Sequence, residues 1–188
     1  MKCSFALALL SLAAAMPAAA AVESYTADPA HTFPNFEISH GGDFTLTRGS
    51  FQKTAGKITL DRQAKTGTIE IVVETASLTT GHTARDNIVR ANWFKTDQFP
   101  QMIYRSKDLK FTGDVPVAAE GELTLAGVTR PVSLTITSFK CRPHPVNKKP
   151  QCGADGTAHI KRSDFGFNAQ SSVGDDVRIL FQIEAYQD

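Results

Sequence analysis

The sequence lacks an excess of charge of either sign. Its 188 residues carry 20 Lys and Arg against 19 Asp and Glu, and no basic block is longer than Lys148-Lys149. Non-specific binding to nucleic acid requires a cationic surface that neutralises phosphates, and a nearly neutral chain does not supply one. We therefore expect no nucleic-acid partner.

Long hydrophobic runs are also missing. The most apolar stretch, from Phe5 to Ala15, follows a single early charge, is shorter than the ~18 to 20 residues that span a bilayer, and leads into an Ala-x-Ala site. This pattern is typical of an export signal. We predict a signal peptide over residues 1–21, cleaved after about Ala20 or Ala21. The remaining residues 22–188 are expected to form one domain with no transmembrane segment.

Cysteine is scarce, because only Cys141 and Cys152 follow the signal, in which Cys3 lies. An exported, oxidising setting favours a disulfide between them. It would close the segment Arg142–Gln151, whose three prolines leave it little means of ordering itself, and would contribute about 2.5 to 3 kcal/mol. The alternative is a metal site built from the two cysteines and His144, which matches no familiar zinc spacing.

The fingerprints of common enzymes are absent. The sequence contains no Gly-x-Ser-x-Gly elbow, His-Glu-x-x-His pair, phosphate-binding loop or dinucleotide motif. Asp28, His31 and His40 could be drawn as the acid-base or metal cluster of a hydrolase-like or metal-dependent enzyme on a hydrophobic substrate. We expect these histidines to be structural, and we expect no catalytic residue, bound metal or cofactor.

What the sequence does have is alternation of apolar and polar residues with a period of two, broken by turn residues. This pattern predicts about eight short strands. They are marked by Phe44 and Leu46, Ile58 and Leu60, Ile69 to Val73, Met102 and Tyr104, Val117 to Leu125, Val128 to Phe139, Gly156 to Lys161, and Val177 to Tyr186.

The clearest of these signals is a hairpin over Gly121–Ile136. Apolar residues alternate with polar ones on both sides of Ala126-Gly127, and a two-residue turn there would place both apolar sets on one face. The same register pairs Arg130 with Leu123 and so turns a charge toward the apolar face. Either Pro131 forces a bulge that sends Arg130 to solvent, or Arg130 meets a polar or anionic head group.

One segment does not alternate. Thr83 to Trp93 contains no Gly or Pro and reads as a short helix, which ends before Phe99-Pro100 because the residue before proline disfavours helical geometry. Arg85 and Asp86 at its start are expected to form an ion pair or a cap.

Antiparallel strands in one neutral domain can form a sandwich or a closed barrel, and phenylalanines spread over nearly every element favour the barrel. An eight-stranded barrel has just enough interior to be filled by side chains or to hold one small ligand. The sequence leaves open which of the two applies.

Four stretches, read in order, resemble the YceI-like family of exported lipid- and polyisoprenoid-binding proteins. They are Tyr25 to His40 with Asp28, His31, Phe33 and Phe36; Leu78 to Asp86 with Trp93-Phe94 and Phe99-Pro100; the Gly121 to Val132 hairpin; and Lys161 to Gly166 followed by Val173-Gly174-Asp175. Phe33-Pro34-Asn35 and Phe167 depart from that family's more usual residues. The resemblance therefore does not determine the local width of the expected channel.

The resemblance implies a lipocalin-like, extended antiparallel β-barrel with a short helix. It implies a periplasmic carrier, with a long isoprenoid lipid, such as a quinone or a polyprenyl phosphate, as its ligand in an apolar channel. A homodimer is left open.

An isoprenoid chain needs a dry tube lined by rings and branched side chains. The predicted lining consists of Phe33, Phe36, Ile38, Phe44, Ile69, Ile71, Phe94, Phe99, Tyr104, Leu123, Leu125, Val132, Leu134, Phe165 and Phe181, with Arg130 as the head-group candidate.

Overall fold

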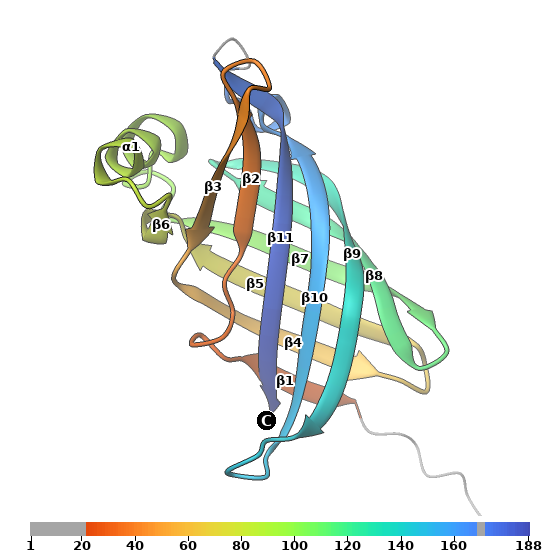
Figure 1. Cartoon of the computed structure of the whole chain (residues 1–188). Helices are drawn as coiled ribbons and strands as arrows, with labels where there is room; N and C mark the ends of the chain where they lie inside the picture. Colours follow the sequence, from red (N-terminus) through yellow and green to blue (C-terminus); the bar gives the residue numbers. More distant parts are fainter. Residues whose placement is uncertain (1–21, 169–171) are drawn as a thin grey trace, which may run out of the picture.

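The computed structural model describes residues 22–168 and 172–188, so the predicted signal peptide lies outside the described residues. Antiparallel strands make up most of the fold, as predicted (Figure 1). The strands are β1 (Glu23–Ala27), β2 (Asn35–His40), β3 (Thr45–Phe51), β4 (Thr54–Asp61), β5 (Thr66–Glu74), β6 (Leu78–Thr79), β7 (Gln101–Thr112), β8 (Val115–Leu125), β9 (Val128–Pro143), β10 (Pro150–Lys161) and β11 (Val173–Gln187).

Eight of these strands close into a barrel. The order is β1-β4-β5-β7-β8-β9-β10-β11, and β11 pairs with β1 to complete the circle. This confirms the predicted barrel, but the membership differs from the prediction. We had not expected β1, whose short sequence carries only Tyr25 and Ala27 as inward-facing apolar residues, and the strand around Phe44 lies outside the closed circle.

The long strand β11 changes partner along its length. Its last residues, Ala185 to Gln187, pair with β1, whereas Val173 to Leu180 pair with β2. Beyond β2 the sheet continues, because β2 pairs with β3 and β3 pairs with β6. The barrel is therefore bounded by different strands at its two ends. We call them the disulfide end, where β1 closes the circle, and the helix end, where β2, β3 and the helix lie (Figure 1).

The β8–β9 hairpin has the predicted register. Ala126 and Gly127 both have positive φ, 49° and 79°, which is the geometry of the tight turns that match strand twist. Leu123 pairs with Arg130, and no register shift occurs at Pro131, so the predicted bulge is wrong. Arg130 is nevertheless exposed.

The predicted helix is present at the helix end. Helix α1 (Thr83–Ile88) continues into a π-helical turn, η2 (Val89–Phe94), which ends at Lys95 in the left-handed region with φ 47°. The side chain of His82 caps α1 by accepting a hydrogen bond from the backbone N–H of Arg85. No helix of the described residues is long and apolar enough to cross a membrane.

Cys141 and Cys152 form the predicted disulfide, which rules out the alternative metal site at these sulfurs. The two residues face each other directly across β9 and β10. The expectation of a poorly ordered loop was wrong, because β9 extends to Pro143 and β10 begins at Pro150. Only a short turn remains, and in it the His144 N–H donates to the Lys149 carbonyl at 2.8 Å.

Inside the barrel, the disulfide end is packed with side chains. Tyr25, Leu60, Leu109 and Ala185 are at most 6% exposed there and form one cluster with Cys152. Only a small apolar void of about 80 Å³ remains among them.

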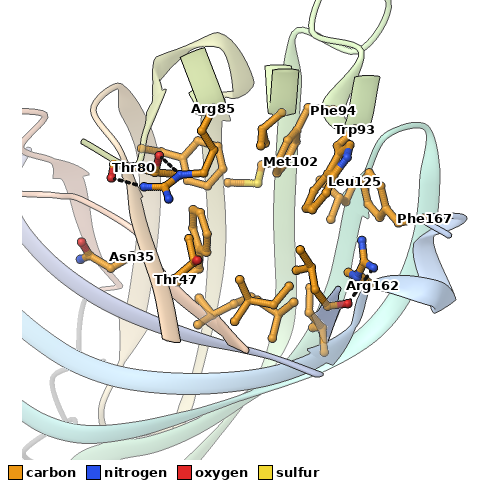
Figure 2. A pocket seen from close by; sticks show the side chains of 18 of the residues that line it. Asn35, Thr47, Thr80, Arg85, Trp93, Phe94, Met102, Leu125, Arg162 and Phe167 are labelled. Atoms are coloured by element: carbon orange, nitrogen blue, oxygen red, sulfur yellow. Dashed lines mark hydrogen bonds between the residues drawn. The ribbon is translucent and has the colours of Figure 1, made fainter. Parts of the chain in front are cut away.

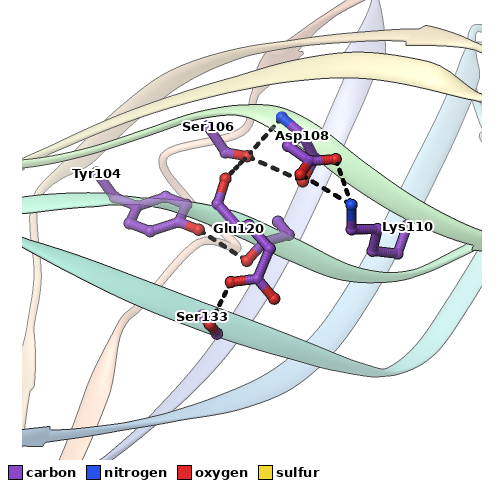
Figure 3. Close-up of polar contacts among 7 residues, drawn as sticks. Tyr104, Ser106, Asp108, Lys110, Glu120 and Ser133 are labelled. Atoms are coloured by element: carbon purple, nitrogen blue, oxygen red, sulfur yellow. Dashed lines mark hydrogen bonds and ion pairs between the residues drawn. The ribbon is translucent and has the colours of Figure 1, made fainter.

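About halfway along the barrel, a buried tyrosine of β7 is hydrogen-bonded to β8 and β9. The buried Tyr104 hydroxyl donates toward the carbonyls of Ala119 and Val132, at 3.1 and 3.2 Å, and its ring lies across Gly121, where any Cβ would come within 2.6 Å of that hydroxyl (Figure 3). Burial, together with the charge of Glu120, raises the pKa of Tyr104 to about 12. Next to it, Ser106 donates to the Glu120 carbonyl at 2.6 Å and supports a bulge in β7.

Candidate functional site

The helix end of the barrel contains a cavity of about 490 Å³, within the range that small-molecule sites occupy. Its walls come from β2, β3, β7, β8, β10, β11, α1 and η2. The lining is predominantly apolar and consists of Phe36, Ile38, Phe51, Ile88, Val89, Trp93, Phe94, Met102, Leu123, Leu125, Ile160, Phe167, Val173, Val177 and Ile179, with Asn35, His40, Thr47, Thr80, Arg85, Arg162 and Ser172 as the polar members.

Four phenylalanine rings form a continuous part of this wall. Phe36 lies 6.1 Å from Phe51, Phe51 lies 5.6 Å from Phe94, and Phe94 lies 5.9 Å from Phe167, between ring centroids. The tilted and edge-on arrangements are those that aromatic pairs favour. Phe36 can lie flat over β3 because its neighbour there is Gly49, where a Cβ would come within 2.4 Å of the ring. The result is a ring-lined surface with few hydrogen-bonding groups.

The cavity is deep on one side and open on the other. Ile38, Phe51, Leu123 and Leu125 are buried in its wall, whereas His40, Arg85, Ile88 and Ser172 are exposed and mark its mouth. An apolar chain could therefore enter between β2 and α1 and leave one polar end near water.

Two arginines are the charged residues of this lining, and they lie on opposite sides of it (Figure 2). Arg162 is 6% exposed, and its Nε and Nη2 donate to the carbonyls of Gly174 and Val173 at 2.8 and 3.1 Å. Its Cζ lies 5.0 Å from the Trp93 ring centroid, a cation–π distance. Trp93, Arg162 and Phe167 also border a second, more polar cleft of about 640 Å³ next to the cavity.

Arg85 is held by Thr80. Its Nε donates to the Thr80 hydroxyl at 2.7 Å and its Nη2 to the Thr80 carbonyl at 2.9 Å. The buried Asp86 in turn accepts from the Thr80 N–H at 2.8 Å and from the Thr80 hydroxyl at 2.5 Å. Burial alone would raise the pKa of Asp86, but the Thr80 hydrogen bonds outweigh it and hold that pKa below its usual range. Of the ion pair or cap expected of Arg85 and Asp86, the direct ion pair is absent from the described contacts, because Thr80 lies between them. Arg85 takes part in a cap through its backbone N–H, which donates to the His82 side chain.

The predicted lining residues divide between the two ends of the barrel. Five line the cavity, namely Phe36, Ile38, Phe94, Leu123 and Leu125. Four border the small void toward the disulfide end, namely Ile69, Ile71, Leu134 and Phe181. Strand alternation turns residues such as Ile69, Leu123 and Leu125 inward, but it carries no information about which end of the barrel each one faces. It does not apply to Phe94, which lies in η2.

The other predicted residues lie elsewhere. Tyr104, Val132 and Phe165 are buried in the cluster behind the cavity wall, and Phe99 borders the adjoining cleft. Phe33 borders none of these cavities. Phe44 was a wrong prediction, because it lies in the turn between β2 and β3 and is 85% exposed.

Arg130, the head-group candidate, is exposed, and its Nη1 donates to the Thr129 carbonyl at 3.1 Å. It is not among the described residues that line the cavity. Arg85 does line the cavity, and sequence reasoning did not predict it there. The helix pattern placed Arg85 correctly on a helix, but no local signal tells that this helix borders the mouth of a cavity.

Asp28, His31 and His40 do not assemble into a cluster. Asp28 accepts from the His31 ring at 2.7 Å in an exposed pair at the disulfide end, whereas His40 pairs with Val173 at the helix end. Asp28 lies beside Glu184, eleven residues along β11 from Val173, which corresponds to roughly 35 Å of extended strand. The three residues therefore do not form the single acid-base or metal cluster that the enzyme alternative requires.

Comparison with known proteins supports what the geometry shows. A family model described as a YceI-like domain matches residues 25–185. The chain belongs to the YceI-like family. Protein YceI of Escherichia coli O6:H1 (strain CFT073) is 31% identical over 162 residues, covering 84% of this chain and 82% of that protein.

Two solved structures share the fold of this YceI-like protein. BcnA of Burkholderia cenocepacia has a TM-score of 0.66 at 23% identity, covering 84% of this chain and 98% of BcnA. A polyisoprenoid-binding domain from Saccharophagus degradans, implicated in plant cell wall breakdown, has a TM-score of 0.67 at 17% identity, covering 87% of this chain and 98% of that domain. At these identities the likeness concerns the fold.

Proposed function

We propose that this protein binds the hydrocarbon chain of an isoprenoid lipid in the cavity at the helix end and carries that lipid in the periplasm. The observation that supports this most strongly is the ring-lined cavity of about 490 Å³, because an isoprenoid chain is all branched hydrocarbon and requires apolar contact rather than hydrogen bonds. Burial of apolar surface contributes about 25 cal/mol per Å², so several isoprene units supply substantial affinity after the cost of ordering them.

Two further observations favour this assignment. The Saccharophagus degradans domain with the same fold is described as polyisoprenoid-binding. The Cys141–Cys152 disulfide fits an oxidising compartment such as the periplasm, where such bonds form and persist. The binding step needs no chemical change in the ligand, so the proposed role is carriage rather than catalysis.

The test is to ask what the protein holds when it is purified from a periplasmic extract. Organic extraction followed by mass spectrometry should give a prenyl lipid, and the emptied protein should take up an added prenyl lipid. Repeated isolation of empty protein that also fails to take up prenyl lipids would contradict the proposal.

A matched pair of variants localises the binding. Val177 lines the cavity, whereas Val146 is 83% exposed in the turn at the disulfide end. Val177→Phe should fill part of the cavity and reduce lipid uptake, and Val146→Phe should leave uptake unchanged. Equal uptake by both variants would place the lipid outside this cavity.

A further inference from the structure

The described lining of the cavity carries positive charge but no acidic side chain. Arg85 and Arg162 line the cavity, and among the described residues of its lining there is no Asp or Glu. The remaining polar members are Asn35, Thr47, Thr80, Ser172 and His40. A ligand that places a negative charge here would be attracted by the guanidinium groups, while the Asp86 carboxylate lies behind Thr80 and outside the lining.

The Arg85 guanidinium is fixed in place by uncharged acceptors, the hydroxyl and the carbonyl of Thr80. The Thr80 hydroxyl gives its hydrogen to Asp86, so toward Arg85 it acts as an acceptor. Arg85 is thus oriented by a hydroxyl and a carbonyl, and the carboxylate that orders the arrangement stays buried behind Thr80. No ion pair of Arg85 occurs among the described residues.

One edge of this guanidinium stays available. Nε and one Nη2 hydrogen are used by Thr80, and Nη1 donates to none of the described residues. Figure 2 shows the group beside Thr80 at the border of the cavity, across from Arg162. Arg162 differs, because it is buried and its donors serve the backbone carbonyls of Val173 and Gly174. Arg85 is exposed and therefore combines an available edge with contact to water.

We propose that Arg85 binds the head group of the lipid through an anionic oxygen, so that the ligand is an isoprenoid phosphate rather than a neutral quinone or alcohol. This rests on the proposed function, since the apolar cavity must hold the chain for its head to reach the mouth. Arginine suits phosphate because its planar donors match two oxygens at once. Asp86 and Thr80 act as positioning residues that hold Arg85 in place.

The experiment compares two ligands that differ only in the phosphate. Calorimetric titration of the protein with farnesyl phosphate and with farnesol should show tighter binding of the phosphate. Arg85→Gln should weaken binding of farnesyl phosphate about tenfold to 100-fold, the usual range for a charge-assisted hydrogen bond, and leave farnesol binding unchanged. Inorganic phosphate alone should bind far more weakly than farnesyl phosphate, because it lacks the chain.

Arg130→Gln is the matched control, because it removes the same charge at an exposed position outside the cavity lining. It should leave both affinities unchanged. Equal affinity for the two ligands in the unaltered protein, an equal loss for both in Arg85→Gln, or a selective loss in Arg130→Gln instead would overturn the assignment. Tight binding of inorganic phosphate would show a site for free anions rather than for a lipid head. If neither prenyl ligand binds the unaltered protein, the proposed function itself fails.

Discussion

The two ends of the barrel share the long strand β11 but differ in the strand that pairs with it. At the disulfide end, β1 closes the circle, and Tyr25, Leu60 and Leu109 fill the space inside. At the helix end, β11 pairs with β2 instead, so that β2, β3 and α1 form a wider boundary around a cavity of about 490 Å³. A change of one strand partner thus separates a region that stabilises the fold from a region that is open to a ligand.

The largest difference in stability between the two ends is expected when one core side chain is shortened at each end. Leu60→Ala at the disulfide end should lower the free energy of unfolding by about 3 to 5 kcal/mol, because tightly packed neighbours cannot collapse into the new space. Leu125→Ala borders an existing cavity and should cost about 2 kcal/mol. Urea unfolding of both variants measures this, and equal losses would mean that the helix end is as tightly packed as the other.

The disulfide is expected to stabilise the fold and to have no effect on ligand binding. Replacing Cys141 and Cys152 together by Ser should lower the free energy of unfolding by about 3 kcal/mol, the chain-entropy value for a separation of 11 residues. Uptake of prenyl lipid by the folded variant should stay unchanged, because the cavity lies at the opposite end. A loss of uptake at a temperature where the variant is fully folded would show that the two ends are coupled.

A smaller effect, dependent on pH, is expected at Asp86. Its folded pKa is depressed, so the carboxylate contributes stability above its unfolded pKa of about 4, and that contribution is lost as the pH falls through the folded value. Asp86→Asn should cost about 1 to 2 kcal/mol at pH 7 and progressively less below pH 4. Unfolding at pH 7 and pH 3 tests this. An equal cost at both pH values would mean that the charge does not stabilise the Thr80 contacts.

The smallest change in stability is expected from a substitution midway between the two ends of the barrel, at Tyr104. Tyr104→Phe removes a hydroxyl that donates toward the Ala119 and Val132 carbonyls and should cost about 0.5 to 1.5 kcal/mol. Lipid uptake should be unaffected, since Tyr104 is not among the described residues that line the cavity. A large loss of uptake with unchanged stability would mean that the ligand reaches this depth.

The sequence was sufficient to predict structural features that are determined by residues close together along the chain. The β8–β9 hairpin follows from alternation and turn residues within a few positions of one another, and the short helix follows from the break in that alternation. The barrel was favoured over a sandwich by the spread of phenylalanines and by the family resemblance. β1 was missed because its place depends on β4 and β11, which lie far away in sequence.

The site was predicted only in part for the same physical reason. Leu123 and Leu125 were placed correctly because strand alternation turns them inward. Phe44 was wrong because it belongs to the exposed turn that precedes β3 and not to the strand. Arg85 and Met102 were missed because a cavity wall is assembled from segments whose proximity only the folded chain establishes.

The single tryptophan allows the most direct test of where the lipid lies. Trp93 is the only one in the sequence and lines the cavity. Titration with a prenyl lipid that carries a nitroxide on its chain should quench Trp93 fluorescence saturably, at the concentrations where calorimetry shows binding. Binding without quenching would contradict a ligand held in the cavity at the helix end.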